Sequence, residues 1–530
     1  MACLRLAVAG GWDPWLMQGR DDGQREFGDA ESLAGHLLPA GSVFAFLAEH
    51  RQRLFPDEVF ADLFPSGRGR PSIPADVIGS VMVLQALHGL SDRQTAEAVT
   101  FDLRWKAACG FAVTETGFHA SVLTYWRRQI AASARPQRVF EMVSEVVAVT
   151  GVLAGKKRRA LDSTILDDAV ARQDTVTQLI AQIRRVAAVV PAAGPVVAGL
   201  SGHDYATGAK PDIAWDDPGA RDLLVSALVT DALTVLDRLE GVELDPKQSE
   251  AVALLALVAG QDFEPAEGSE GTDGRWRIAR KVAPDRVIST VDPQARHAHK
   301  SREKKQDGFK AHVVVEPDTG LVTAATLTMA AGAENSDAAR GIELLAADPT
   351  ITGDADIQVL GDSAYGSGEL LATVAAAGRV AVIKPMPIGR PVTGGFTIDH
   401  TARTATCPAG TTRPISDQGR ATFGAVCATC PLRARCTTSA RGRKLVIGEH
   451  DQIRREHRAR AREPQFAADY RRHRPMVERS IAWLTRGARR VPYRGVDKNS
   501  TWWTLRAAAI NLRTLLRLGL TALPTGWATA

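Results

Sequence analysis

Residues 308–330 read GFKAHVVVEPDTGLVTAATLTMA, and this stretch decides the fold class. Its first half alternates in character, with Phe309, Ala311, Val313 and Val315 between Lys310, His312, Val314 and Glu316. The tripeptide Asp318-Thr319-Gly320 supplies a turn, and Leu321 to Met329 returns as a second strand. The stretch therefore predicts a β-hairpin with Lys310 and His312 on its polar face.

Further strands are predicted on both sides of this hairpin. Upstream, residues 157–166 (KKRRALDSTI) contain a short apolar run that reads as the end of a strand at Ala160–Asp162. Downstream, Ile357–Gly361 (IQVLG) is a buried-type strand ending at Asp362, and Val380–Lys384 is another strand. With the intervening helices, this order predicts a mixed α/β sheet resembling that of ribonuclease H.

Two insertions are expected in the sheet, and an all-α domain is expected before it. Residues 168–285 are mostly helical in pattern, and residues 386–448 are loop-rich and Cys-rich. Together with both insertions, the catalytic domain is expected to span residues 155–520. Residues 41–150 are predicted to be a helical DNA-binding domain, and residues 1–40 are poorly patterned.

A helix-turn-helix outline lies in the N-terminal helical region. The segment Pro74–Gly89 places its apolar residues on one side at helical spacing, and Gly89 ends this helix. Ser91 with Gln94 three residues later is a capping-box pattern that starts the next helix. Two helices joined by a glycine-containing turn favour DNA binding, and an ordinary helical bundle remains the alternative.

Composition and charge favour a globular protein that binds a polyanion. The 530 residues include 45% hydrophobic and 24% charged residues, and the net charge of +5 is too small to indicate nucleic acid by itself. Residues 431–495, however, hold 18 Lys or Arg against 6 Asp or Glu, which favours phosphate binding. No apolar stretch reaches the roughly 20 residues that span a bilayer, so we expect no membrane association and a cytoplasmic, nucleoid-associated protein.

Three acidic residues are candidates for metal-dependent phosphoryl transfer. Such chemistry uses two divalent ions held by oxygen ligands. Asp162 and Asp362 each close a predicted strand, so neighbouring strands would bring both to one edge of the sheet. Glu478 lies on a helix predicted from Pro464 to about Arg490, with Arg474 one turn earlier on the same face. Each acid alone also fits a turn, a cap or a salt bridge, but the order strand, strand, helix favours catalysis.

Several segments resemble those of DDE transposases from bacterial insertion sequences. The three signatures are ALDSTILDDAV (160–170), VLGDSAYGS (359–367) and YRRHRPMVERSIAWL (470–484). The segment GRPSIPADVIGSVMVLQALHGLSDRQTAEAV (69–99) is similar to the InsH-type N-terminal domain, and DGFKAHVVVEPDTGLV (307–322) matches the hairpin. The resemblance implies a ribonuclease H-like fold and end cleavage followed by strand transfer. It also implies two Mg²⁺ or Mn²⁺ ions, with Asp162, Asp362 and Glu478 as the metal-binding catalytic residues.

The glutamate helix departs from the family pattern of Tyr, two residues, Arg, three residues, Glu, six residues, Lys. Arg474 is in place, but Arg471 stands at the tyrosine position and Tyr470 is one residue early. Thr485 stands at the lysine position, with Arg486 next to it. The side chains expected to contact DNA are Lys310, His312, Lys384, Tyr470, Arg474 and Arg486.

Four cysteines are candidates for a structural Zn²⁺ site. Cys407, Cys427, Cys430 and Cys436 are spaced C-x19-C-x2-C-x5-C, and the C-x2-C pair has the short spacing of zinc knuckles. The segment is poor in apolar residues, so a metal ion could replace a core. Free thiols in an inert loop are the alternative.

The expected partners are the terminal inverted repeats of an element, target DNA and a second copy of the chain in a homodimer. One alternative function is a catalytically inactive, domesticated DNA-binding protein. Another is a metal-dependent DNA endonuclease without strand transfer. A third is a tyrosine recombinase that uses residues 471–474 (RRHR) and Tyr493.

Overall fold

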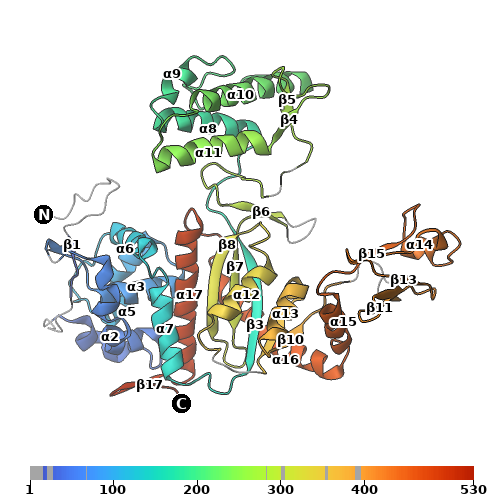
Figure 1. Ribbon diagram of the computed structural model, residues 1–530. Coiled ribbons are helices and arrows are strands. Elements are labelled where there is room, and N and C mark those ends of the chain that lie inside the picture. The colour runs from blue at the N-terminus through green and yellow to red at the C-terminus, as the bar shows by residue number, and fades with distance from the viewer. Residues whose placement is uncertain are drawn as a thin grey trace.

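The computed structural model describes residues 16–20, 28–66, 68–281, 283, 285–299, 305–351, 356–387 and 395–530. A mixed sheet lies at its centre, with strand order β10-β9-β3-β7-β6 and β8 paired to β7 (Figure 1). Its strands are β3 (Arg158–Asp167), β6 (Arg296–His299), β7 (Lys305–Val315), β8 (Val322–Met329), β9 (Gln358–Gly361) and β10 (Val380–Ile383). The strands β3, β9 and β10 are parallel, whereas β7 is antiparallel to β3, β6 and β8.

The predicted hairpin is confirmed as β7 and β8. Its turn is closed by the N–H of Gly320, which donates to the carbonyl of Glu316 at 2.8 Å. Gly320 has a φ of 81°, a left-handed conformation that glycine adopts without a steric penalty. The local sequence of the turn therefore accounts for the register of the two strands.

Helices cover both faces of this sheet. On one face, α16 (Pro464–Thr485) and α17 (Val496–Arg517) pack against alternate residues of β7 such as Val313. On the other face, α12 (Asp337–Ala347) and α13 (Gly368–Ala376) pack against the intervening residues, such as Leu161 and Val314. The hairpin therefore has no solvent-facing polar side, which corrects the prediction for Lys310 and His312.

The predicted ends of one strand and one helix differ from those in the structure. Strand β3 continues to Asp167, so Asp162 lies within the strand and not at its end. The reason is that β7 pairs with residues 160–167 of β3, whereas β9 pairs only with residues 158–160. Helix α16 begins at the predicted Pro464 but ends at Thr485, short of the expected Arg490, and Gly487 then turns the chain with a φ of 68°.

The N-terminal region is helical. Its helices are α1 (Ala30–Ala34), α2 (Val43–Leu54), α3 (Ala75–His88), α4 (Asp92–Phe101), α5 (Leu103–Cys109), α6 (Ser121–Ala132) and α7 (Arg138–Val149), with 3₁₀ turns η1 (Gly35–Leu37) and η2 (Asp57–Leu63). The short strands β1 (Leu16–Met17) and β2 (Arg70–Pro71) pair in parallel. Gly89 ends α3 with a φ of 68°, and Ser91 with Gln94 forms the expected capping box. Helix α17 lies between these helices and the sheet and shares one core with both (Figure 1).

A helical insertion separates β3 from β6. It contains α8 (Thr175–Val189), α9 (Ala193–Ala198), α10 (Pro218–Arg238), α11 (Pro246–Gln261) and the pair β4 (Phe263–Pro265) and β5 (Trp276–Ile278). These elements surround a hydrophobic core of their own, at the top of Figure 1. The region expected to be mostly helical is therefore helical, and its hydrophobic core is separate from the core of the sheet.

The segment after β10 forms a small module of short strands. It contains β11 (Thr397–Asp399), β12 (Thr404–Thr406), β13 (Thr412–Pro414), β14 (Arg420–Thr422) and β15 (Lys444–Val446), with η5 (Gly424–Cys427) and α14 (Arg433–Cys436). Among the described residues, its small buried apolar core contains Phe396, Ala405, Ala421, Phe423 and Leu445, with partly buried isoleucines packed against it. Helix α15 (Asp451–Arg460) then leads back to α16.

The C-terminal hairpin of β16 (Thr521–Leu523) and β17 (Gly526–Ala528) returns to the N-terminal helices. The guanidinium of Arg53 on α2 donates to the carbonyls of Leu523 and Gly526 and lies over the Trp527 ring. Within the described ranges, none of the helices combines the length and the hydrophobicity that a membrane crossing requires.

Candidate functional site

The register of two parallel strands places Asp162 beside Asp362. Ala160 of β3 is level with Leu360 of β9, and each aspartate follows two residues later. Side chains two residues apart share a face, and neighbouring strands lie about 4.8 Å apart. Ala160 and Leu360 pack in the core beneath α16 and α17, so both aspartates are directed to this same face.

Helix α16 brings Glu478 to that face. The helix contacts β3, β7, β9 and β10, and its fully buried Val477 and Leu484 fix its rotation on the sheet. The side chain of Glu478 is 65% exposed, whereas that of Arg474 one turn earlier is only 5% exposed. The glutamate therefore lies at the solvent edge of the packed face.

A guanidinium group joins two of the three acids. Arg474 Nη2 lies 2.9 Å from Asp162 Oδ1, and its Nη1 donates to Asp162 Oδ2 at 3.2 Å. The same Nη1 lies 3.9 Å from Glu478 Oε1. Among the described residues, no three His, Cys, Asp or Glu side chains are grouped closely enough to hold a metal ion. The predicted acids thus share one face, with Arg474 between Asp162 and Glu478.

The electrostatics of Asp162 favour a cation at this place. Burial raises the pKa of Asp162, Arg474 opposes that rise, and the negative charge of Asp362 adds to it. Each aspartate also accepts one backbone hydrogen bond of 2.9 Å, Asp162 from Ser163 and Asp362 from Ala364. The predicted cap role is therefore observed at Asp362, and it leaves the second carboxylate oxygen for other ligands.

Two residues expected to face DNA are enclosed by α12. His312 is fully buried, and burial holds the pKa of its imidazole well below its ordinary value. Lys310 Nζ donates to Asp337 Oδ2 at 2.6 Å. Neither side chain is free to contact DNA in this structure, because the apolar face of α12 packs on this side of the hairpin.

The other predicted DNA-contacting residues lie at or near the surface. Lys384 is exposed, and its backbone N–H donates to the carbonyl of Gly361, the residue before Asp362. Tyr470 is half-buried, and burial raises the pKa of its hydroxyl, whereas the charge of Arg474 lowers it. Arg486 is exposed just beyond the end of α16, about 12 Å along the helix axis from Glu478.

A row of arginines beside the site was not predicted. His457 of α15 lies 2.7 Å through Nε2 from the carbonyl of Ile383, and Ile383 is level with Gly361 in the sheet. Arg454 and Arg458 flank this contact on α15, and no ion pair of either is found in the described part of the chain. Burial and neighbouring arginines lower the pKa of Arg458. The four-residue spacing of these arginines is the sequence signal that could have identified them.

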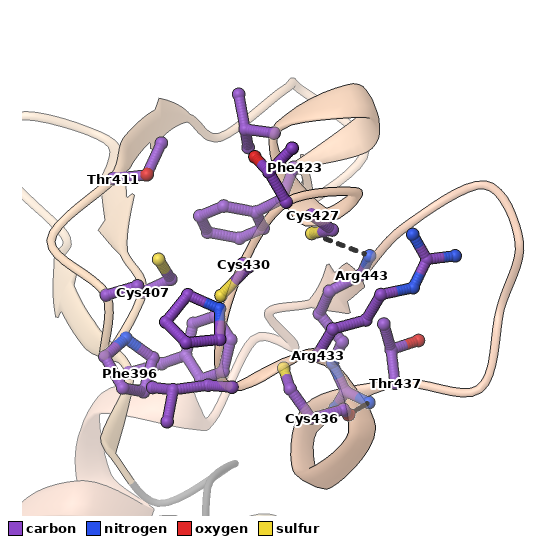
Figure 2. A pocket seen from close by; sticks show the side chains of 16 residues that line it. Phe396, Cys407, Thr411, Phe423, Cys427, Cys430, Arg433, Cys436, Thr437 and Arg443 are labelled. Carbon is purple, nitrogen blue, oxygen red and sulfur yellow. Dashed lines mark hydrogen bonds between the residues drawn. The ribbon is translucent and has the colours of Figure 1, made fainter.

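The four cysteines of the small module line one cavity of about 240 Å³. Cys407, Cys427, Cys430 and Cys436 are all free thiols, and Figure 2 shows them around this cavity together with Arg443. Burial raises the pKa of Cys436, and the three other thiols raise it further. The backbone N–H of Arg443 donates to Cys427 Sγ at 3.4 Å. Residues separated by up to 29 positions are thus brought to one pocket.

The recombinase alternative gains no support from this geometry. Burial raises the pKa of Tyr493 to about 12, and the guanidinium of Arg127 lies 5.3 Å from its ring centre. Arg474, the last residue of the RRHR segment, is engaged with Asp162. Tyr493 is therefore not presented as a nucleophile beside clustered arginines.

Two family models match separate parts of the chain. Residues 406–516 match the model described as "Transposase DDE domain", and residues 35–129 match the one described as "Transposase domain (DUF772)". The first range contains the four cysteines of the small module and Glu478, and the second contains the helix-turn-helix outline. No curated protein and no solved structure gives a significant match to the chain.

Proposed function

The chain belongs to the DDE transposases, enzymes that act on DNA, and from this we propose that it cuts the ends of an insertion sequence and joins them to target DNA. The observation that carries the proposal is the shared face of three acids. Asp162 and Asp362 come from adjacent parallel strands, and Glu478 comes from the helix packed across them. A ribonuclease H-like arrangement is supported by the position of β3 between antiparallel β7 and parallel β9.

DDE transposases use divalent metal ions, and the donor set here suits them. Carboxylate oxygens are the ligands that Mg²⁺ and Mn²⁺ prefer, and the contact with Arg474 shows that Asp162 is already paired with a cation. We assign Asp162, Asp362 and Glu478 as the ligands of two such ions. When bound, the ions supply activation of the attacking oxygen and stabilisation of the leaving oxygen.

The basic residues around the acids are proposed to hold the DNA backbone. Arg474 lies between two of the acids, so its guanidinium can exchange a carboxylate for a phosphate without leaving the site. Arg454 and Arg458 extend the positive surface along α15 beyond the edge strand β10. Tyr470, Lys384 and Arg486 would add contacts, and the row would follow one DNA strand toward Asp362.

The N-terminal helices are proposed to recognise the element's terminal inverted repeats. The α3-turn-α4 unit matches a helix-turn-helix outline, as an InsH-type N-terminal domain would supply. We propose residues 41–150 as this domain and residues 155–520 as the catalytic domain with its two insertions. Because two ends of one element must be joined together, we also propose that the enzyme acts as a homodimer.

A structural Zn²⁺ is proposed for the cysteine module. Four free thiols line one cavity, and in the described part of the module five apolar residues are buried. A core of this size is too small to stabilise a fold without a further link. Cys407, Cys427, Cys430 and Cys436 would hold the ion and join the strands, and four ligands would leave no position for substrate.

The decisive experiment uses DNA that carries an element end and its flank. The wild-type enzyme is expected to nick the end with Mg²⁺ and not with EDTA, and to join the cut 3′ end to a target plasmid. Asp362→Asn is expected to lower cleavage by at least 10³-fold while it keeps wild-type affinity in a gel-shift assay. Asp356→Asn, at the other end of β9 and exposed, is the matched control and should cleave normally.

Each alternative function gives a different result in this experiment. A wild-type chain that binds the DNA but does not cleave it with Mg²⁺ or with Mn²⁺ would be identified as a domesticated DNA-binding protein. Metal-dependent cleavage without joined products would identify a nuclease. A covalent protein–DNA adduct that survives denaturation would instead support the tyrosine recombinase.

A further inference from the structure

A second cluster of buried polar side chains lies behind the predicted acids, on the α12 face of the sheet. His312 is level with Ser163 across β3 and β7, one residue after Asp162. Its Nδ1 lies 3.7 Å from Asp337 Oδ1 at the start of α12. The other oxygen of Asp337 accepts the hydrogen bond from Lys310. These contacts join the strand that carries Asp162 to the first turn of α12.

Tyr365 connects the same cluster to Asp362. It is the last residue of the 3₁₀ turn η3 (Ser363–Tyr365), whose N-cap is Asp362. The Tyr365 ring packs between Gly361 and Gly341, where an added Cβ atom would approach the ring to 3.2 Å and 3.1 Å. The hydroxyl lies beside Ser163 and within electrostatic reach of Asp337, Asp162 and Asp362. One side chain therefore meets the segments of both aspartates.

The polarity of this cluster is not explained by stability. Both ring nitrogens of His312 and Asp337 Oδ1 are buried and have no hydrogen-bond partner within the described ranges, and the buried Tyr365 hydroxyl has only the neighbouring Ser163 side chain beside it, without full hydrogen-bond geometry. Nearly all buried polar atoms in folded proteins are paired, and apolar groups of the same shape would stabilise the fold at least as well. Three polar residues with open hydrogen-bonding capacity, all behind the acids, indicate a role in the site.

We propose that Tyr365, His312 and Asp337 form a positioning network that orients the Asp362 turn and the Asp162 strand from the opposite face of the sheet. Lys310 holds Asp337 in place, Asp337 faces the imidazole, and Tyr365 fixes the turn that follows Asp362. None of the three touches the DNA or the metal ions. Their effect is on how well the two aspartates converge as ligands, and this inference rests on the proposed function.

Tyr365→Phe tests the network, because it removes one hydroxyl and keeps the packed ring. The full-length variant is expected to keep the wild-type melting temperature and the wild-type affinity for an element end. Its affinity for Mn²⁺, measured by calorimetry without DNA, is expected to fall about 10-fold, as for outer groups that orient metal ligands. The Mn²⁺ concentration for half-maximal cleavage should rise by the same factor.

Two further variants separate positioning from a general packing effect. Tyr205→Phe is the matched control, because Tyr205 is also buried but donates to Asp231 at 2.8 Å within the helical insertion. This control should leave Mn²⁺ affinity unchanged. Asp337→Asn should weaken Mn²⁺ binding, and Asp337→Glu, which keeps the carboxylate, should bind Mn²⁺ more tightly than Asp337→Asn.

The outcomes distinguish this inference from the proposed function. Wild-type affinity for Mn²⁺ in Tyr365→Phe and in Asp337→Asn would overturn the network. If these variants bind Mn²⁺ more weakly than wild type, and the wild-type enzyme itself cuts no DNA, the network would be supported and the proposed reaction overturned. A wild-type chain that binds no Mn²⁺ would overturn both.

Discussion

At the scale of single residues, Asp168 is a buried acid among other acids. It follows β3 directly, is 6% exposed, and its Oδ2 has no hydrogen-bond partner among the described residues. Burial raises the pKa of Asp168 to about 6, and the charges of Asp307 and Asp292 add to the rise. The folded protein therefore binds this proton more tightly than the unfolded chain does.

Asp168→Asn is expected to stabilise the protein only at high pH. Because the folded pKa is raised, the stabilising proton is present at low pH and lost as the pH rises through about 6. The melting temperature of the variant should exceed that of wild type by about 2 °C at pH 8, the shift that ~1 kcal/mol produces. At pH 3, below the ordinary pKa of 3.8, the two curves should coincide, and an equal difference at both pH values would contradict this account.

At the scale of elements, Arg506 of α17 joins the ends of two other helices. Its Nε donates to the carbonyl of Leu484 at 2.6 Å and its Nη2 to that of Arg486 at 3.0 Å, at the end of α16. Its Nη1 donates to the carbonyl of Ala86 in the last turn of α3 at 3.0 Å. Burial lowers the pKa of Arg506 to about 10, so it stays charged at neutral pH. The positive charge complements both helix dipoles.

Arg506→Met is therefore expected to destabilise the protein by about 3 kcal/mol, since it leaves two buried carbonyls and one partly buried carbonyl without a charged donor. Urea unfolding followed by circular dichroism measures the change. Arg513→Met on the same helix is the control, because Arg513 contacts the Trp483 ring and its loss should cost under ~1 kcal/mol. Equal losses in the two variants would exclude a specific role for Arg506.

The elements that could be predicted from sequence are those with local signals. The β7–β8 hairpin follows from alternation and the turn at Gly320, and the α3–α4 unit follows from Gly89 and Ser91. The burial of His312 could not be predicted, because alternation does not show that α12 covers the second face. The Arg474–Asp162 contact joins residues 312 positions apart, and a helix-face argument gives the face of Arg474 but not its partner.

At the scale of the whole molecule, the cysteine module should be the part whose folding depends on metal. The purified chain is expected to contain about one Zn²⁺ per molecule by elemental analysis. Cys430→Ser should lose this zinc and become cleavable by trypsin within residues 395–448, while the sheet stays resistant. Cys109→Ser, in the N-terminal core, is the control and should keep the zinc. A zinc-free wild type with a protease-resistant module would contradict the proposed site.

Helix α17 has a consequence for where DNA is cut. It packs on β8, α3, α7 and α16 at once, and through Arg506 the end of the first helix-turn-helix helix is hydrogen-bonded to the end of the glutamate helix. On the proposed function, the unit that reads the repeat and the acids that cut the DNA are therefore joined through one helix. The scissile phosphate must then stand a constant number of base pairs from the recognised repeat, whatever bases lie between.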